Sequence, residues 1–129
     1  MPNPLRAAVA LLAALTVLAA GRAAAEDRID LPSRPGVTQP IIYLPAPAPV
    51  ASAILFPGGR GEIAGEPNNF LLRIRGEFAG QGISVAVIDA PSDHADGLST
   101  EYRASADAAQ DLAAVARRSE ERRVGKECV

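Results

Sequence analysis

The chain is poor in the residues that build several kinds of functional site. Its 129 residues include no Trp, one His and one Cys, Cys128. A single Cys cannot form an internal disulfide and cannot by itself build a zinc site, so both are excluded. Thirteen basic residues stand against fifteen acidic ones. This mildly acidic balance gives no electrostatic case for binding nucleic acid. The length also excludes a complete (β/α)₈ barrel, which needs about 200–250 residues.

The residues that are present divide the chain into three parts, and the first, 1–25, predicts a secretory signal peptide. Arg6 closes a positively charged start, 7–20 form an apolar run, and small residues at 23–25 suit signal peptidase. As a helix the run spans roughly 21 Å, which is too short for a hydrocarbon core of about 30 Å. We therefore expect signal peptidase to cleave after Ala25. The mature protein would then be periplasmic or extracellular, with no stable membrane anchor.

The last part, 118–129, has an unusual composition for the end of a domain. It is dense in charged residues and contains Cys128. From Arg118 to Cys128 it resembles, codon for codon, the in-frame translation of a common sequencing adapter. The alternative is a charged, solvent-exposed tail. We interpret 118–129 as an adapter-derived artefact, which leaves 26–117 as the domain segment.

The segment 26–117 is acidic and carries the fold. Seven Arg, no Lys and twelve acidic residues give it a net charge of −5. Apolar runs predict strands at 39–44, 51–56 and 83–88, and the lack of polar alternation favours burial on both faces. Because Pro40 lacks a backbone N–H, we expect the first of these strands at an edge of the sheet.

Two helices are predicted from apolar residues at helical spacing. The first covers about 69–79 with Asn68 or Asn69 as its cap, and the second runs from a Ser105 cap to Arg117. The residues expected to be buried are Leu71, Ile74 and Phe78 in the first helix and Ala108, Leu112, Val115 and Ala116 in the second. The order strand–strand–helix–strand–helix predicts an α/β fold with a mostly parallel sheet.

The loop after the second predicted strand, 57–67, is the main candidate for chemistry, and we call it the glycine loop. Its glycines permit positive φ and let a ligand approach bare backbone. One interpretation is a dinucleotide site, because Gly59, Gly61 and Ala64 match the G-x-G-x-x-[GA] pattern after a strand. That pattern requires a helix to begin inside the motif, whereas here it is expected near Asn69. The other interpretation is that backbone N–H groups face a developing oxyanion.

A family resemblance supports the oxyanion interpretation. It rests on Leu-Phe-Pro-Gly-Gly-Arg-Gly at 55–61 together with Val-Ile-Asp-Ala-Pro-Ser-Asp at 87–93. Over about 37–117 the chain resembles the N-terminal part of exported bacterial α/β-hydrolases. The resemblance implies a partial α/β-hydrolase sheet of about three strands and two helices. It also implies an oxyanion hole to which the backbone of Gly58, Gly59 and Arg60 contributes.

The resemblance assigns no catalytic residue to this chain. In the family, the Ser nucleophile lies on a G-x-S-x-G turn after the next strand, and the acid and the His follow later. We expect the domain segment to be truncated at Arg117, before that strand. Ser84 lies in Gly-Ile-Ser-Val-Ala, but the nucleophile turn needs a strand before the Ser and a helix after it, and Ser84 is expected inside a strand.

Asp89 and His94 are possible site-lining residues. Asp89 ends a predicted strand, where ligands of open α/β sheets bind, although an Asp there also suits a turn. His94 is the only His and stands among acidic residues, as is typical of a solvated loop. A metal site needs at least three protein ligands, so neither a metal nor another cofactor is expected.

The expected function is that of a fragment of an exported serine-dependent hydrolase, inactive because its catalytic triad is missing. The complete protein would act on a small ester, thioester or amide. One alternative is a non-catalytic periplasmic α/β binding module. Another is a fragment of a dinucleotide-binding oxidoreductase. A G-x-S-x-G turn beyond Arg117 would favour the hydrolase over the binding module. Binding of NAD would favour the oxidoreductase.

Overall fold

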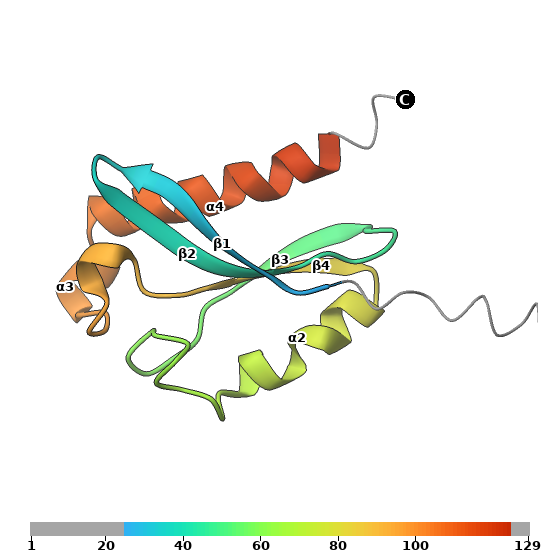
Figure 1. Ribbon diagram of the computed structural model, residues 1–129, viewed down its shortest axis with the longest axis horizontal. Coiled ribbons are helices and arrows are strands. Elements are labelled where there is room, and N and C mark those ends of the chain that lie inside the picture. The colour runs from blue at the N-terminus through green and yellow to red at the C-terminus, as the bar shows by residue number, and fades with distance from the viewer. Residues whose placement is uncertain (1–24, 125–129) are drawn as a thin grey trace, which may run out of the picture.

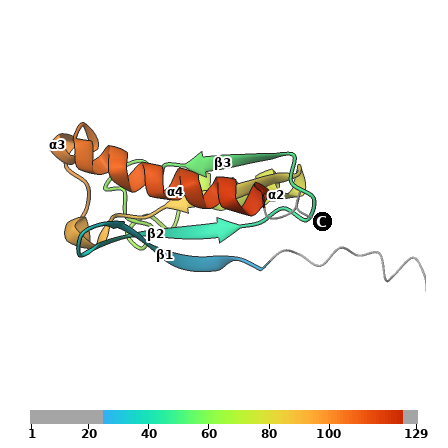
Figure 2. The same cartoon turned by 90° about the horizontal axis from the view of Figure 1, so that it is seen from above.

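A four-stranded sheet in the order β1-β2-β4-β3 forms the centre of this computed structural model, which describes residues 25–124. In chain order the elements are β1 (Asp27–Arg34), β2 (Val37–Leu44), β3 (Ala51–Leu55), α2 (Phe70–Gly80), β4 (Ile83–Ile88), η1 (Ser92–His94), α3 (Thr100–Arg103) and α4 (Ala106–Val124). Helix α4 covers one face of the sheet and α2 the other (Figure 1). Seen from above, α4 runs lengthwise over the sheet (Figure 2).

The prediction of a mostly parallel, α/β-hydrolase-like sheet is wrong. The pairings β1–β2 and β2–β4 are antiparallel, and only β3–β4 is parallel. A tight turn at Gly36, with φ of 73°, joins β1 to β2 as a hairpin. The link 45–50 is too short for a crossover, so β3 does not pair in parallel with β2. Helices bury both faces of this sheet, but such burial does not fix strand direction.

The edge position predicted for the strand with Pro40 is also wrong, because β2 lies between β1 and β4. The carbonyl of Pro40 accepts a hydrogen bond from the N–H of Asp89 at 3.0 Å. In an antiparallel strand the N–H and C=O of one residue point to the same neighbour. The missing donor of Pro40 therefore faces Asp89, whose carbonyl accepts instead from Nε2 of Gln39 at 2.6 Å.

Strand β1 was not predicted. It is an edge strand in which apolar Ile29 and Leu31 alternate with polar residues, and both pack against the core beside α4. Its charged residues and Pro32 suit an edge, where a lost ladder donor is tolerated. The alternation of apolar and polar residues that indicates a strand is therefore present in the sequence. Pro32 and the charged residues made it difficult to recognise.

Both predicted helices are present. Asn69 caps α2, and its Oδ1 accepts from the N–H of Leu71 at 2.9 Å. The hydroxyl of Ser105 accepts from the N–H of Ala108 at 3.2 Å at the start of α4. Of the seven residues predicted to be buried, only Val115 is fully so. Leu112 is 37% exposed, and the other five are partly buried. In α2 the buried residue is Leu72. The residues of α4 that are buried are Asp111, Ala114, Val115 and Ser119.

The core has one cluster on each face of the sheet. On the α4 face, Ile41 and Val115 are fully buried, and on the α2 face Leu72 packs with Val85 and Val87. None of the helices described within 25–124 is long and apolar enough to cross a membrane. The predicted signal peptide, apart from Ala25, lies outside the described residues, as do 125–129 of the predicted artefact.

Candidate functional site

The glycine loop folds as a tight turn that requires glycine at two of its positions. Gly59 and Gly61 have φ of 62° and 76°, which side-chain-bearing residues rarely adopt. The N–H of Gly61 donates to the carbonyl of Gly58 at 3.2 Å and closes the turn. A Cβ atom on Gly59 would collide with the carboxylate of Glu66, and one on Gly61 would collide with Leu98. Gly58 has open space around it.

Contacts from the segment after β4 hold this loop in place. The N–H of Leu98 donates to the carbonyl of Arg60 at 2.7 Å. Nη2 of Arg103 donates to the carbonyl of Gly59 at 2.6 Å. The guanidinium of Arg60 in turn donates to the carbonyl of Asp96. The two loops that leave the carboxyl ends of β3 and β4 are therefore joined.

The N–H groups of Gly59 and Arg60 donate no hydrogen bond within residues 25–121. Both residues are exposed. In a trans peptide the N–H points away from the carbonyl of the preceding residue. Because the carbonyls of Gly58 and Gly59 are engaged, the two N–H groups are held on the opposite side of their peptides. They are two adjacent backbone donors that are open to an external acceptor.

The structure places Asp89 as an anchor for this loop. Its Oδ1 accepts from the N–H of Ile63 at 2.8 Å and from that of Ala90 at 2.9 Å. Its Oδ2 forms an ion pair with Nη1 of Arg28 at 3.0 Å. A buried carboxylate must be paired and hydrogen-bonded in this way. Asp89 lines the cavity described below. Residues 89–91 form no turn, because Pro91 has no N–H with which the Asp89 side chain could close one.

His94 is half-buried and packs against a neighbouring ring rather than facing the cavity. Its ring centroid lies 4.3 Å from that of Tyr102, with an interplanar angle of 42°. Its Nε2 is 3.9 Å from Oδ2 of Asp93. Within the described residues no group of His, Cys, Asp and Glu could hold a metal ion.

A cavity of about 200 Å³ opens at the carboxyl ends of β3 and β4, beneath α3 and the start of α4. Gly58, Gly59, Arg60 and His94 do not line it. Its apolar lining consists of Phe56, Ile88, Pro91, Leu98, Ala108 and Leu112. Its polar lining consists of Gln39, Asp89, Tyr102, Arg103 and Asp111. The cavity therefore lies beside the glycine loop, and Arg103 links the two.

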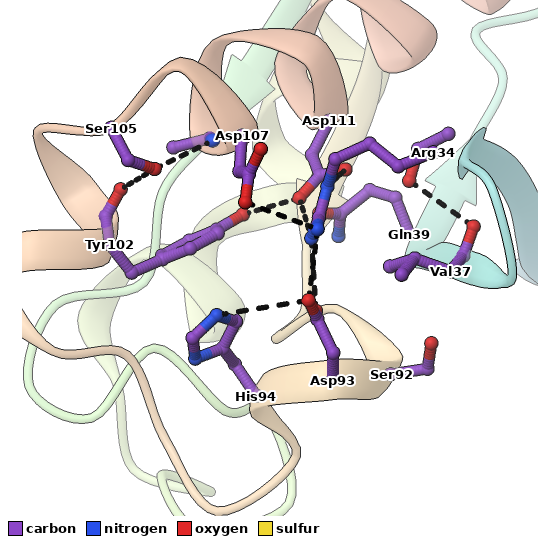
Figure 3. A network of polar contacts seen from close by, with 12 residues as sticks. Arg34, Val37, Gln39, Ser92, Asp93, His94, Tyr102, Ser105, Asp107 and Asp111 are labelled. Carbon is purple, nitrogen blue, oxygen red and sulfur yellow. Dashed lines mark hydrogen bonds and ion pairs between the residues drawn. The ribbon is translucent and has the colours of Figure 1, made fainter.

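One wall of the cavity is fixed by a cluster around Arg34, which we call the arginine network (Figure 3). Arg34 bonds Asp111 through Nε and Nη2, both at 3.0 Å, and Asp93 through Nη1 and Nη2, both at 2.9 Å. Nη1 also reaches Asp107 at 3.4 Å. The hydroxyl of Tyr102 donates to Asp111 at 2.7 Å. A guanidinium has five N–H donors, and all five of these are used.

The network shifts the titration of its members. Hydrogen bonds from Arg34 hold the pKa of Asp93 below its usual value. Burial alone would raise the pKa of Asp111, but the bonds from Arg34 and Tyr102 outweigh it and the pKa is lowered. Burial and the bond to Asp111 raise the pKa of the Tyr102 phenol. At neutral pH Asp93 and Asp111 are therefore charged and the Tyr102 phenol is neutral.

Sequence reasoning missed Arg34, Tyr102, Arg103 and Asp111. The bond from Arg34 to Asp111 joins residues 77 positions apart, so no local spacing reports it. A correct reading of β1 would have brought Arg34 to the sheet end. Ser84 is a buried strand residue as predicted, and its hydroxyl accepts from the N–H of Ala46 at 3.0 Å.

The dinucleotide interpretation gains no support from this geometry. Helix α2 begins at Phe70, well after the motif that ends at Ala64, so no helix N-terminus faces the glycines. Comparison with protein-family models, with curated proteins and with solved structures finds no match for this chain. Its function is therefore inferred from the site itself.

Proposed function

We propose that this chain supplies the oxyanion-binding loop of an exported serine-dependent hydrolase that acts on a small ester, thioester or amide. The observation that supports it is the pair of open N–H groups at Gly59 and Arg60, in a loop pinned by Leu98 and Arg103. Donors that are already held in position stabilise the negative oxygen of a tetrahedral intermediate without reorganising. The proposal rests on this loop and not on the sheet, which is mixed.

In this proposal the nucleophile lies outside residues 26–117. Its hydroxyl oxygen would add to the substrate carbonyl carbon while a base takes the hydroxyl proton. The carbonyl oxygen would become the oxyanion that the loop binds. As the oxyanion collapses, the bond from the carbonyl carbon to the leaving group would break, and the alcohol, thiol or amine would take the proton from the base. Water would then hydrolyse the acyl-enzyme and release the acid. The resemblance to α/β-hydrolases assigns the nucleophile to a G-x-S-x-G turn.

Sequencing the source DNA beyond the codon for Arg117 tests this proposal most directly. We expect the adapter-like codons to be replaced by a strand, a G-x-S-x-G turn and a helix. A fluorophosphonate probe should label the longer protein and should leave the mature form of the present chain unlabelled. Absence of the turn, or labelling of the present chain, would contradict the proposal.

A second candidate function is non-catalytic binding in the periplasm. The observation that favours it is the cavity, which is formed by the described residues without a nucleophile. A genomic sequence that continues without the G-x-S-x-G turn would favour this candidate over the hydrolase.

A further inference from the structure

We propose that the cavity beside the glycine loop binds a small apolar carboxylate. The carboxylate would pair with Arg103, and the hydrocarbon part would lie against Phe56, Leu98 and Leu112. The inference does not depend on the proposed hydrolase, because binding in this cavity needs no nucleophile.

The apolar part of the ligand is indicated by side chains that the chain itself leaves uncovered. Four large apolar residues are exposed among the described residues, and two of them, Phe56 at 54% and Leu112 at 37%, line this one cavity. They come from the end of β3 and from α4, so they face the cavity from different elements. Apolar groups that converge on a concave site favour an apolar ligand.

The acidic groups that line the cavity are already compensated. Asp89 is bonded to Arg28 and to two backbone N–H groups. Asp111 is bonded to Arg34 and to Tyr102. Each lining carboxylate therefore has a cationic partner. Arg34 is shared with Asp93 and the exposed Asp107, however, so the arginine network as a whole is net negative, and a singly charged anion suits the cavity better than a doubly charged one.

Arg103 is the lining residue with donors to spare. Its side chain makes no ion pair within the described residues, and the one hydrogen bond of its guanidinium there goes to the carbonyl of Gly59. A guanidinium has five N–H donors in a planar fork that matches a carboxylate. The amide of Gln39, by contrast, donates to the carbonyls of Pro40 and Asp89. Arg103 is thus the one cationic side chain among the described residues that line the cavity, and its free donors favour an anion.

The volume limits the ligand to a small molecule. Pockets for drug-sized ligands measure about 300–1,000 Å³. This cavity measures about 200 Å³ and is open to solvent on one side. A monocarboxylate with a short hydrocarbon chain fits these dimensions, and hexanoate is a suitable probe.

Titration of the mature chain with three probes of equal chain length tests the charge preference. Hexanoate, hexan-1-ol and hexylamine would each be followed by backbone amide NMR shifts at Leu98, Arg103 and Leu112. We expect saturable binding of hexanoate, at least about tenfold tighter than that of hexylamine, because a charged hydrogen bond contributes that much. Hexan-1-ol should bind more weakly at the same residues.

Two pairs of variants locate the site. Arg103→Gln should weaken hexanoate binding at least about tenfold and leave hexan-1-ol binding unchanged. Its control, Arg73→Gln, changes an exposed residue on α2, on the other face of the sheet. Ala108→Leu fills the cavity and should abolish binding of both probes, whereas Ala109→Leu on the exposed side of α4 should not.

Three results would overturn the proposal. They are no saturable binding of hexanoate, equal affinity for hexanoate and hexylamine, and unchanged hexanoate affinity in Arg103→Gln. Because Arg103 also holds the glycine loop, hexan-1-ol binding reports whether that variant remains folded. If the variant does not fold, the probe comparison on the unaltered chain still decides.

Discussion

Arg34 joins three carboxylates at the point where the β1–β2 hairpin meets η1 and α4. Its side chain is 10% exposed, and Asp111 beneath it is 1% exposed. A buried ion pair contributes little net stability relative to apolar packing, but removing one partner leaves the other charge buried and unpaired. The arginine network therefore fixes how these elements meet, and its loss should greatly lower the free energy of unfolding.

Replacing Arg34 tests this role through the pH dependence of stability. At neutral pH, Arg34→Ala should lower the free energy of unfolding by about 3–5 kcal/mol. The pKa values of Asp93 and Asp111 are lowered in the folded state. Their contribution is therefore complete above the unfolded pKa and is lost as pH falls through the folded pKa, below about pH 4.

The variant should respond to acid in the opposite sense, because protonation neutralises its unpaired Asp111. The difference in free energy of unfolding between the unaltered protein and Arg34→Ala should therefore become smaller as pH falls. Urea unfolding from about pH 7 to about pH 3 measures both curves. A gap that stays constant over this range would show that the Arg34–Asp111 contact does not set the pH dependence.

The glycine loop provides a second residue-scale prediction. Gly59→Ala introduces a Cβ at positive φ and against Glu66, so we expect a loss of about 1–3 kcal/mol. Gly58→Ala is the matched control, since Gly58 has open space and no positive φ, and it should be neutral or slightly stabilising. Thermal unfolding of the two variants measures the difference. Equal effects would mean that the turn does not depend on glycine at position 59.

At the scale of elements, helices were predicted better than the sheet because their signals are local. Asn69 and Ser105 cap α2 and α4 within a few residues of where the chain becomes helical. Strand order depends on pairings between distant residues, such as Ile41 with Ile88. The glycine loop was found from composition, whereas Arg103 reaches it only through the fold. Strand order and the contact of Arg103 with the glycine loop therefore depend on tertiary contacts, which local sequence patterns do not predict.

Helix α4 continues without a break through Arg117, where we placed the end of the domain segment. Residues of high helix propensity extend a helix whatever their origin, so this continuity does not test the adapter interpretation. Ser119 is buried, but its hydroxyl bonds only to the carbonyl of Val115 in the same helix. Nε of Arg118 is buried and has no hydrogen-bond partner in the described part of the chain.

Deleting 118–129 should therefore cost about 1 kcal/mol or less. Val115→Ala is the comparison, since Val115 on the same helix is fully buried and its truncation should cost about 2 kcal/mol. Urea unfolding of both proteins measures the two values. A deletion that costs more than Val115→Ala would mean that the tail belongs to the fold.

At the scale of the whole molecule, the sheet has two unlike edges. Strand β1 carries charged residues and Pro32, which discourage pairing with another chain. Strand β3 at the other edge is uncharged, and exposed Val50 and Phe56 flank it. An uncharged edge strand with free backbone groups is a template for pairing. Antiparallel pairing of two β3 strands about Ala53 would place Val50 of one copy opposite Phe56 of the other.

We therefore expect the mature chain to self-associate through β3 as its concentration rises. Ser52 is exposed on this edge, so Ser52→Lys would place two like charges close together across the pairing and should shift the equilibrium toward monomer. Asp30→Asn on β1 is the control, because it alters the other edge and should leave association unchanged. Sedimentation velocity at increasing concentration measures the monomer fraction. A protein that stays monomeric throughout, or that associates equally well as Ser52→Lys, would show that this edge does not pair with a second copy.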